Sequence, residues 1–328
     1  MTDTNVTIIV APRERFSYTE KSLESIYENT QTPFELIYID GNSPSYVQKY
    51  LESKSKQKGF RLIRTEHYLS PNQARNLGLP HVKTKYVVFI DNDVLVTPGW
   101  LDTLITSAEE TGAWLVGPLT LFGSEFKTVH FAGGTIELQE KEGKTWMTQK
   151  RPFMHHPLDA VRDKIQPGYT DILELHCMLA RADVFTETGP FDEKFMSMCE
   201  EDDLCMAVAN IGQKVYLEPN AVVTYVAPSP TDVDWSDLPF FFVRWSDAWC
   251  QTSVERCQSK WNLTEDSPFL GNTRYFVTLH RTFVNPRPKQ QPVKYLAYAV
   301  RRVFFFDIIQ KIMNNKAAQL LSQGKASA

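Results

Sequence analysis

Two carboxylates one residue apart follow an apolar run in the first third of the chain. Residues 86–93 read Tyr-Val-Val-Phe-Ile-Asp-Asn-Asp, which places Asp91 and Asp93 directly after the run. Short apolar runs are typical of buried strands, and ligands of open α/β sheets bind where such strands end. Two carboxylates held side by side repel each other unless a cation or a proton lies between them. The pair therefore predicts a site for a divalent cation and a phosphate.

Polar residues also follow the first and second strand patterns, at what should be the same edge of the sheet. Any one such segment is an ordinary strand-to-turn transition, but their joint appearance on successive strands favours a nucleotide pocket. The residues in question are Pro12, Arg13, Asp40, Asn42, Asp91 and Asn92. Arg75 precedes the fourth strand on a helical segment and has the fork geometry to support the site carboxylates or a phosphate. The alternative for that segment is an exposed amphipathic helix.

A second acidic group comes much later in the chain. Glu200, Glu201, Asp202 and Asp203 stand before Leu204 and a helical pattern. Carboxylates at a helix N-terminus are stabilising by themselves, so a simple cap is one interpretation. The other is a general base, because taking a proton from a hydroxyl group requires a carboxylate in a partly desolvated cleft. The cluster alone leaves both open.

The elements that must position these residues alternate between strand and helix patterns. Ser17-x-x-Glu20 predicts a capping box, and Ser70-Pro71 predicts the start of another helix. Such alternation is typical of an α/β fold with a mostly parallel sheet covered by helices on both faces. The strands expected in this part of the chain are Val6–Val10, Glu35–Ile39, Phe60–Ile63, Tyr86–Ile90 and Ala113–Val116.

The texture of the sequence divides the chain into three parts. Residues 1–118 carry the strand–helix alternation and the predicted nucleotide pocket. Residues 119–227 are less regular, with a polar hairpin or loop over Glu137–Lys150 and a buried strand over Ile172–Ala180. Residues 228–328 are expected to form a helical, aromatic-rich and basic extension.

Composition is that of an ordinary soluble protein, with 42% hydrophobic and 23% charged residues among 328. Five cysteines without a Cys-x-x-Cys pair predict reduced thiols in a cytoplasmic protein. The start of the chain lacks a secretory pattern, and no apolar run is long enough to span a membrane. From Arg281 onward, nine Lys or Arg face one acid. The basic, aromatic segment Tyr295–Met313 suits an interfacial helix on the inner membrane face; a helix docked on the body, or a dimer contact, is the alternative.

Taken together, the motifs resemble those of the family 2 inverting glycosyltransferases, which have the GT-A fold. The resemblance covers roughly residues 4–227. Its motifs are Asp40-Gly-Asn-Ser43, Ala74-Arg75-Asn76-x-Gly78, Asp91-x-Asp93, Gly189-Pro-Phe191-Asp192-Glu193-x-Phe195 and Glu200-Glu201-x-Asp203-Leu204. His130-Phe-Ala-Gly133-Gly134 is similar to the rhamnosyltransferase-like branch of that family.

The resemblance implies a nucleotide-sugar donor and an inverting hexosyl- or deoxyhexosyltransferase. Asp40 would bind the nucleobase, and Asp91 and Asp93 would hold Mn²⁺ or Mg²⁺ against the diphosphate. Of the Glu200–Glu201 pair, Glu201 takes the position of the base, and Asp203 would orient the acceptor or the loop. The acceptor would be a glycan or a lipid-linked molecule in cell-surface polysaccharide or glycolipid synthesis. No nucleic-acid partner is expected.

The chain departs from the family pattern at two places that matter. Arg13-Glu14-Arg15 replaces an asparagine-containing loop, and Tyr225 stands where many members supply a histidine to the metal. His130 and His176 are ligand candidates from elsewhere in the chain. A catalytically inactive member that binds a nucleotide sugar or glycan is therefore an alternative. A sugar-phosphate nucleotidyltransferase is another, although it should show a glycine-rich loop after the first strand, where this chain has no glycine.

Overall fold

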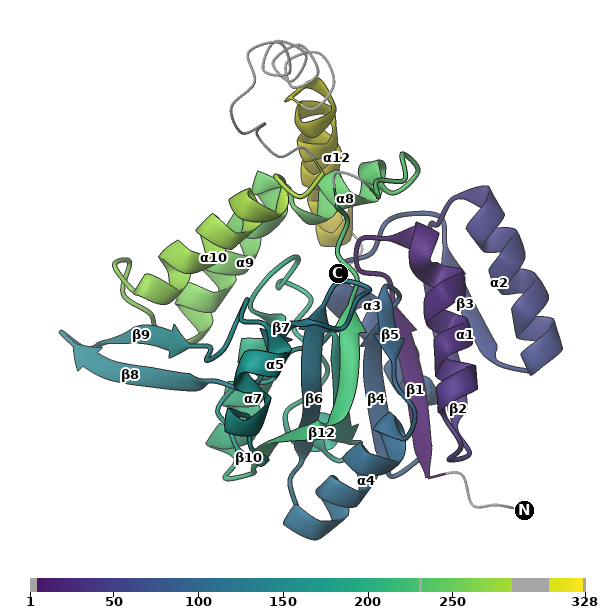
Figure 1. The fold of residues 1–328 in the computed structure, drawn as a ribbon. Helices are drawn as coiled ribbons and strands as arrows, with labels where there is room; N and C mark the ends of the chain where they lie inside the picture. Colours follow the sequence, from purple (N-terminus) through teal and green to yellow (C-terminus); the bar gives the residue numbers. More distant parts are fainter. Residues whose placement is uncertain (1–4, 230–231, 285–306, 327–328) are drawn as a thin grey trace.

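A ten-stranded, mixed sheet forms the centre of the molecule in the computed structural model, which describes residues 5–229, 232–284 and 307–326. Its strand order is β10-β12-β6-β11-β4-β1-β2-β3, with β5 paired to β12 and β7 paired to β6 (Figure 1). The strands are β1 (Val6–Ala11), β2 (Glu35–Gly41), β3 (Arg61–Thr65), β4 (Tyr86–Asp91), β5 (Val94–Val96), β6 (Leu115–Phe122), β7 (Thr128–Phe131), β10 (Gly168–Tyr169), β11 (Cys177–Arg181) and β12 (Val215–Tyr225). A separate hairpin consists of β8 (Thr135–Lys141) and β9 (Lys144–Lys150).

The five strands expected in the first part of the chain are confirmed within a few residues of their bounds, and four of them, β1 to β4, pair in parallel. The strand expected over Ile172–Ala180 is shorter than predicted, because β11 begins only at Cys177. The preceding residues are buried beneath a helix rather than paired in the sheet: Leu173 donates its backbone N–H to Cys205 Sγ. An apolar run marks burial but does not by itself distinguish a strand from a packed loop.

Helices cover both faces of the sheet, as the alternation predicted. Along β1, Ile8 and Val10 pack on one side, in a core shared with the first and fourth helices, whereas Ile9 packs on the other with the third and seventh. This follows from the two-residue period of a strand. The helices concerned are α1 (Thr19–Asn29), α2 (Ser45–Lys58), α3 (Pro71–Gly78), α4 (Trp100–Thr111) and α7 (Glu200–Asn210), and short helical turns are η1 (Phe16–Tyr18), η2 (Leu79–His81), α5 (Leu158–Val161), η3 (Arg162–Lys164) and α6 (Val184–Glu187).

The helix start predicted at Ser70-Pro71 is confirmed, whereas the capping box predicted at Ser17-x-x-Glu20 is wrong. Ser70 and Gln73 exchange side-chain and backbone hydrogen bonds at the start of α3. The helix near Ser17 begins instead at Thr19, without a side-chain cap, after the turn η1. Ser17 donates its hydroxyl to Asp237, at 2.5 Å, on the C-terminal extension. Ser17 therefore bonds to a residue more than two hundred positions away and does not cap the helix that follows it.

The C-terminal helices lie over the edge of the sheet at which the parallel strands end (Figure 1). They are α8 (Leu238–Arg244), α9 (Asp247–Lys260), α10 (Pro268–His280) and α12 (Asp307–Ala326). Phe240 of α8 lies with its ring centroid 5.1 Å from those of both Phe16 and Tyr68. The extension thus packs, through aromatic rings, against one side of the donor edge, the sheet edge at which the nucleotide pocket was predicted.

The predicted interfacial segment Tyr295–Met313 falls largely outside the described residues. In its described part, Ile309 and Met313 of α12 pack against the core of the extension. Just beyond the segment, Ala317 is fully buried and Lys316 Nζ lies 4.7 Å from the centre of the Tyr68 ring. This part of α12 therefore docks on the body. Among the described residues, no helix has the length and apolar character to span a bilayer. The five cysteines are free and buried, as expected for thiols outside a disulfide framework.

Candidate active site

A cavity of about 470 Å³ lies between the sheet edge and the C-terminal helices, and several of its lining residues carry charge. Its walls come from the end of β6, from β7, from the residues after β9 and before β11, from the start of α7, from the end of α8 and from one face of α10. The lining includes Arg13, Phe122, His130, Arg151, Glu174, His176, Glu200, Glu201, Asp202, Arg244, Trp245, Phe269, Phe276 and Phe283. A concave site with an apolar wall and a few convergent polar groups is the usual form of a small-molecule site.

The start of α7 places one carboxylate at the cavity with few partners. Glu200 is buried and pairs with Arg244, the Oε1–Nη2 distance being 2.9 Å. Its neighbour Glu201 keeps 14% of its side chain exposed, and its nearest cation is Arg151 at 3.7 Å. Burial, with repulsion from Glu200 and Asp202, raises the pKa of Glu201 to about 8. A carboxylate with a pKa near the working pH is suited to accept a proton from a hydroxyl group.

Asp203 points away from this cavity. Its carboxylate accepts hydrogen bonds from Lys260 Nζ at 2.8 Å and from Trp261 Nε1 at 2.9 Å, at the end of α9. Through these bonds the residue ties the start of α7 to the extension. Of the three residues predicted for catalysis, Glu200 and Glu201 therefore line the cavity and Asp203 holds the helix that carries them.

The loop after β4 is held by two arginines. Asp91 lies 3.3 Å from Arg75 through one oxygen and 3.3 Å from Arg13 through the other. Asn92 accepts a hydrogen bond from the backbone N–H of Arg13 at 2.9 Å. Both oxygens of Asp93 are buried without a hydrogen-bond partner. Burial and the nearby Glu14 raise the pKa of Asp93 well above its ordinary value. A buried, unpartnered carboxylate is costly to the fold and fits a cation.

The predicted nucleobase residue is sealed within its own turn. Asp40 accepts hydrogen bonds from the backbone N–H and hydroxyl of Ser43, at 2.9 and 3.0 Å, and pairs with Arg64. Asn42 adopts a φ of 64° in this turn. Pro12 packs against it, since a Cβ added at Gly41 would lie 3.1 Å from Pro12 Cγ. These residues lie at the same sheet edge as Asp91 and Asp93, and none of them lines the cavity.

Tyr225, at the position where a histidine ligand was expected, has another partner. Its hydroxyl donates to Glu14, which also accepts from Trp245 Nε1. Its ring stacks on His176 with the centroids 4.1 Å apart. The phenol is thus bonded to the buried Glu14 and stacked on a ring. Burial and the charge of Glu14 raise the pKa of Tyr225 well above its ordinary value, and Asp93 adds to this effect.

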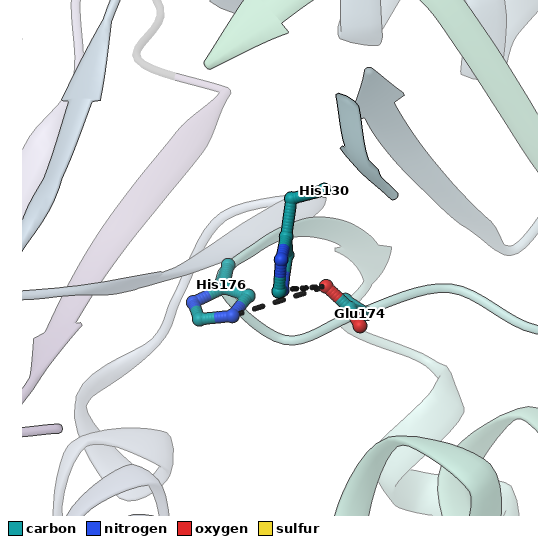
Figure 2. Close-up of side chains that lie close together, drawn as sticks. All are labelled: His130, Glu174 and His176. Atoms are coloured by element: carbon teal, nitrogen blue, oxygen red, sulfur yellow. Dashed lines mark ion pairs between the residues drawn. The ribbon is translucent and has the colours of Figure 1, made fainter. Parts of the chain in front are cut away.

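His130, Glu174 and His176 all line the cavity, and both histidines are directed at Glu174 (Figure 2). Glu174 Oε2 lies 3.1 Å from His130 Nε2 and 3.8 Å from His176 Nε2. One ligand atom from each of the three lies within 4.8 Å of the others, a spacing that can hold a metal ion. Burial opposes the charge on Glu174, but His130 and Arg151 hold its pKa below the ordinary value.

Sequence reasoning identified the two histidines separately and missed Glu174, Arg151 and Arg244. The spacing Glu174-x-His176 just before a buried strand was an available signal. His130 lies 44 residues before Glu174, however, and periodicity says nothing about which distant segments meet. The charged contacts then run in a continuous series: Arg151 lies 2.6 Å from Glu174, and His176 lies 3.2 Å from Asp91. They connect the α7 carboxylates to the loop after β4.

The chain is similar in sequence to known proteins over most of the sheet. The family model described as glycosyl transferase family 2 matches residues 7–185. An uncharacterized glycosyltransferase of Haemophilus influenzae is 26% identical over 222 residues, covering 67% of this chain and 64% of the relative. A pre-mycofactocin glycosyltransferase of Mycobacterium tuberculosis is 23% identical over 225 residues, covering 67% of this chain and 42% of the relative. The chain thus spans less than two thirds of the length of these curated relatives.

Two solved structures share the fold. The mannosyltransferase PcManGT from Pyrobaculum calidifontis, in complex with GDP-Man and Mn²⁺, has a TM-score of 0.54 at 13% identity, over 97% of this chain and 85% of that one. GalNAc-T7 with UDP, GalNAc and Mn²⁺ has a TM-score of 0.54 at 16% identity, over 92% of this chain and 58% of that one. The predicted GT-A architecture is confirmed.

Proposed function

Because this chain belongs to glycosyltransferase family 2, we propose that it moves a sugar from a nucleotide-diphosphate donor to an acceptor hydroxyl group with inversion at the anomeric carbon. The observation that carries the proposal is the position of Glu201, a cavity carboxylate with a raised pKa. It is joined through Arg151, Glu174 and His176 to the loop that carries Asp91. A candidate base at the cavity is thus linked by charged contacts to the sheet edge, where the cavity residues Arg13 and His176 lie beside Asp91.

In the proposed reaction, Glu201 takes the proton of the acceptor hydroxyl group while the hydroxyl oxygen attacks the anomeric carbon. The bond from that carbon to the diphosphate breaks, and the electron pair leaves with the nucleoside diphosphate. Arg13 and Arg244 bring positive charge to the cavity wall, where a departing diphosphate is stabilised by it. Because attack and departure occur on opposite faces of the sugar, one displacement inverts the centre.

Asp91 and Asp93 would hold a divalent cation, Mn²⁺ or Mg²⁺, that neutralises charge on the diphosphate. The unpartnered oxygens of Asp93 fit this role, whereas those of Asp91 already lie beside two arginines. Asn42 and Pro12 would contact the nucleoside from the turn that Asp40 holds through Ser43 and Arg64. Arg75 and Asn92 would hold the loop after β4. For Asp203 we propose the positioning role that its bonds to Lys260 and Trp261 support.

The acceptor side of the cavity favours a molecule with an apolar part. Phe269, Phe276 and Phe283 bring aromatic rings to the wall formed by α10 and the residues after it. Aromatic side chains stack on sugar faces and also bury apolar chains. We propose a glycan or lipid-linked acceptor, as in cell-surface polysaccharide or glycolipid synthesis.

The proposed function is tested by donor binding and donor turnover together. UDP-, GDP- and dTDP-sugars should be compared by thermal shift, because a ligand that binds only the native state stabilises it by about 2.7 kcal/mol at 100 times its Kd. We expect one nucleotide class to raise the Tm and to release its nucleotide when an acceptor is present. A Tm rise without release, over a panel of glycan and lipid-linked acceptors, would favour the binding-protein alternative. Binding of no donor would contradict both.

The pH dependence of transfer should follow the charge environment of Glu201. Because a base must be deprotonated, kcat/KM should rise with pH through a midpoint near pH 8. Arg151 lowers this pKa, so Arg151→Gln should move the rising limb to higher pH by roughly one unit. Arg151→Lys keeps the positive charge and should leave the limb nearly in place. Coincident limbs for all three proteins would remove Arg151 from this role.

A further inference from the structure

We propose that His130, Glu174 and His176 form a binding site for a transition-metal ion such as Zn²⁺, separate from the Asp91–Asp93 pair. The three side chains come from β7 and from the segment that leads into β11. They converge on the cavity from two directions, with His130 and His176 facing Glu174 (Figure 2).

The ligand atoms have the spacing of a small coordination sphere. Glu174 Oε2 lies 3.1 Å from His130 Nε2 and 3.8 Å from His176 Nε2, and the three ligand atoms lie within 4.8 Å of one another. Ligands at 2.0–2.2 Å from one metal ion are roughly 3–4 Å apart. Glu174 Oε2 is buried, lies between the two imidazole nitrogens and makes no hydrogen bond of good geometry with either. A buried carboxylate oxygen in that position suits a metal ligand.

Each ligand that lies deep in the protein is held by a second contact. The other carboxylate oxygen of Glu174 pairs with Arg151 at 2.6 Å, which leaves Oε2 directed at the histidines. His176 is held by the stacking of its ring on Tyr225, and its Nδ1 lies 3.2 Å from Asp91 Oδ2 without a hydrogen bond of good geometry. A carboxylate behind a metal-binding histidine fixes the orientation of the ring and increases its basicity. The Asp91 carboxylate would thus serve both the donor edge and this group.

The donor set selects the kind of ion. Two imidazoles and one carboxylate suit Zn²⁺ and its neighbours among the transition metals, whereas Mg²⁺ and Ca²⁺ favour all-oxygen sites. By contrast, the Asp91–Asp93 pair offers only oxygen ligands. All three residues line the cavity, so an ion can enter, and three protein ligands leave a coordination position open toward it.

The site is tested by metal binding, so that its outcome does not depend on the proposed function. The full chain, treated with a chelator and desalted, should be titrated with Co²⁺ while visible absorption is recorded. A second metal-free sample should be incubated with Zn²⁺ and desalted, and its Zn²⁺ content should be measured by mass spectrometry. We expect one equivalent of each metal at this site. His130→Gln, at a partly exposed position, should weaken binding by more than about 100-fold, because removing a ligand costs more than removing an orienting partner. Glu174→Gln should weaken it similarly.

Two controls separate this site from other sources of binding. His155→Ala removes an exposed histidine of the same cavity that is not one of the three ligands, and it should bind as the unaltered chain does. Asp93→Asn should also retain the absorption bands. Thermal melts of the metal-free proteins would verify that each is folded. The proposal is overturned by the absence of Co²⁺ and Zn²⁺ binding, by unaltered binding in folded His130→Gln, or by loss of the bands in Asp93→Asn alone.

Discussion

Glu201→Gln should lower the rate of sugar transfer by roughly 10²–10⁴-fold, the usual contribution of a general base. Glutamine keeps the size and the polar contact near Arg151 but cannot accept the acceptor proton. Because Glu201 is not among the donor-edge residues, the Tm rise produced by a bound nucleotide sugar should persist. The measurement is kcat for nucleotide release, together with the donor-induced thermal shift.

Asp202→Asn is the matched control for this change. Asp202 also lines the cavity and also adds negative charge beside Glu201, but Gln149 donates a hydrogen bond to it. Its replacement should retain most of the turnover and should lower the pH midpoint, since one source of repulsion is removed. Turnover that survives in Glu201→Gln but is lost in Asp202→Asn would transfer the role of base to Asp202.

Asp93→Asn should abolish most of the turnover and yet stabilise the fold. The asparagine lacks the charge that a cation would neutralise, so transfer should fall by at least about 10²-fold. The native fold raises the pKa of Asp93, and the folded state therefore binds more protons than the unfolded state over that interval. The free energy of unfolding of the unaltered chain should accordingly fall as the pH rises above the ordinary aspartate pKa, and the variant should lack this decline.

Asp91→Ala gives the contrasting result at the neighbouring carboxylate. Asp91 pairs with two arginines, of which Arg75 is fully buried. Removing the Asp91 carboxylate therefore leaves a buried positive charge without this partner. We expect a loss of about 3–5 kcal/mol in the free energy of unfolding. Urea unfolding at several pH values from about 5 to about 9 would give the free energy of unfolding of both variants. Destabilisation of both by similar amounts would mean that Asp93 is a structural residue.

Most of the scaffold was predictable because its signals are local. The apolar runs of β1 and β4 lie a few residues from the polar turns that end them, and Ser70 caps α3 through a residue three positions away. Ser17 shows the limit of such reasoning. Its sequence pattern also matches a capping box, but its hydroxyl donates a hydrogen bond to the distant Asp237 instead.

The sequence by itself determined the α/β scaffold, the family and the edge at which the acidic loops gather, because strand period, turn chemistry and motif order are properties of short segments. Only the tertiary structure decided which carboxylates are paired and which are left for chemistry. Glu200 and Asp203 have partners on the C-terminal helices, Glu201 has one arginine at 3.7 Å, and the carboxylate of Asp93 has no hydrogen-bond partner. The partners come from segments far apart in the chain, and the energy of a buried charge depends on what surrounds it in space rather than on its neighbours in sequence.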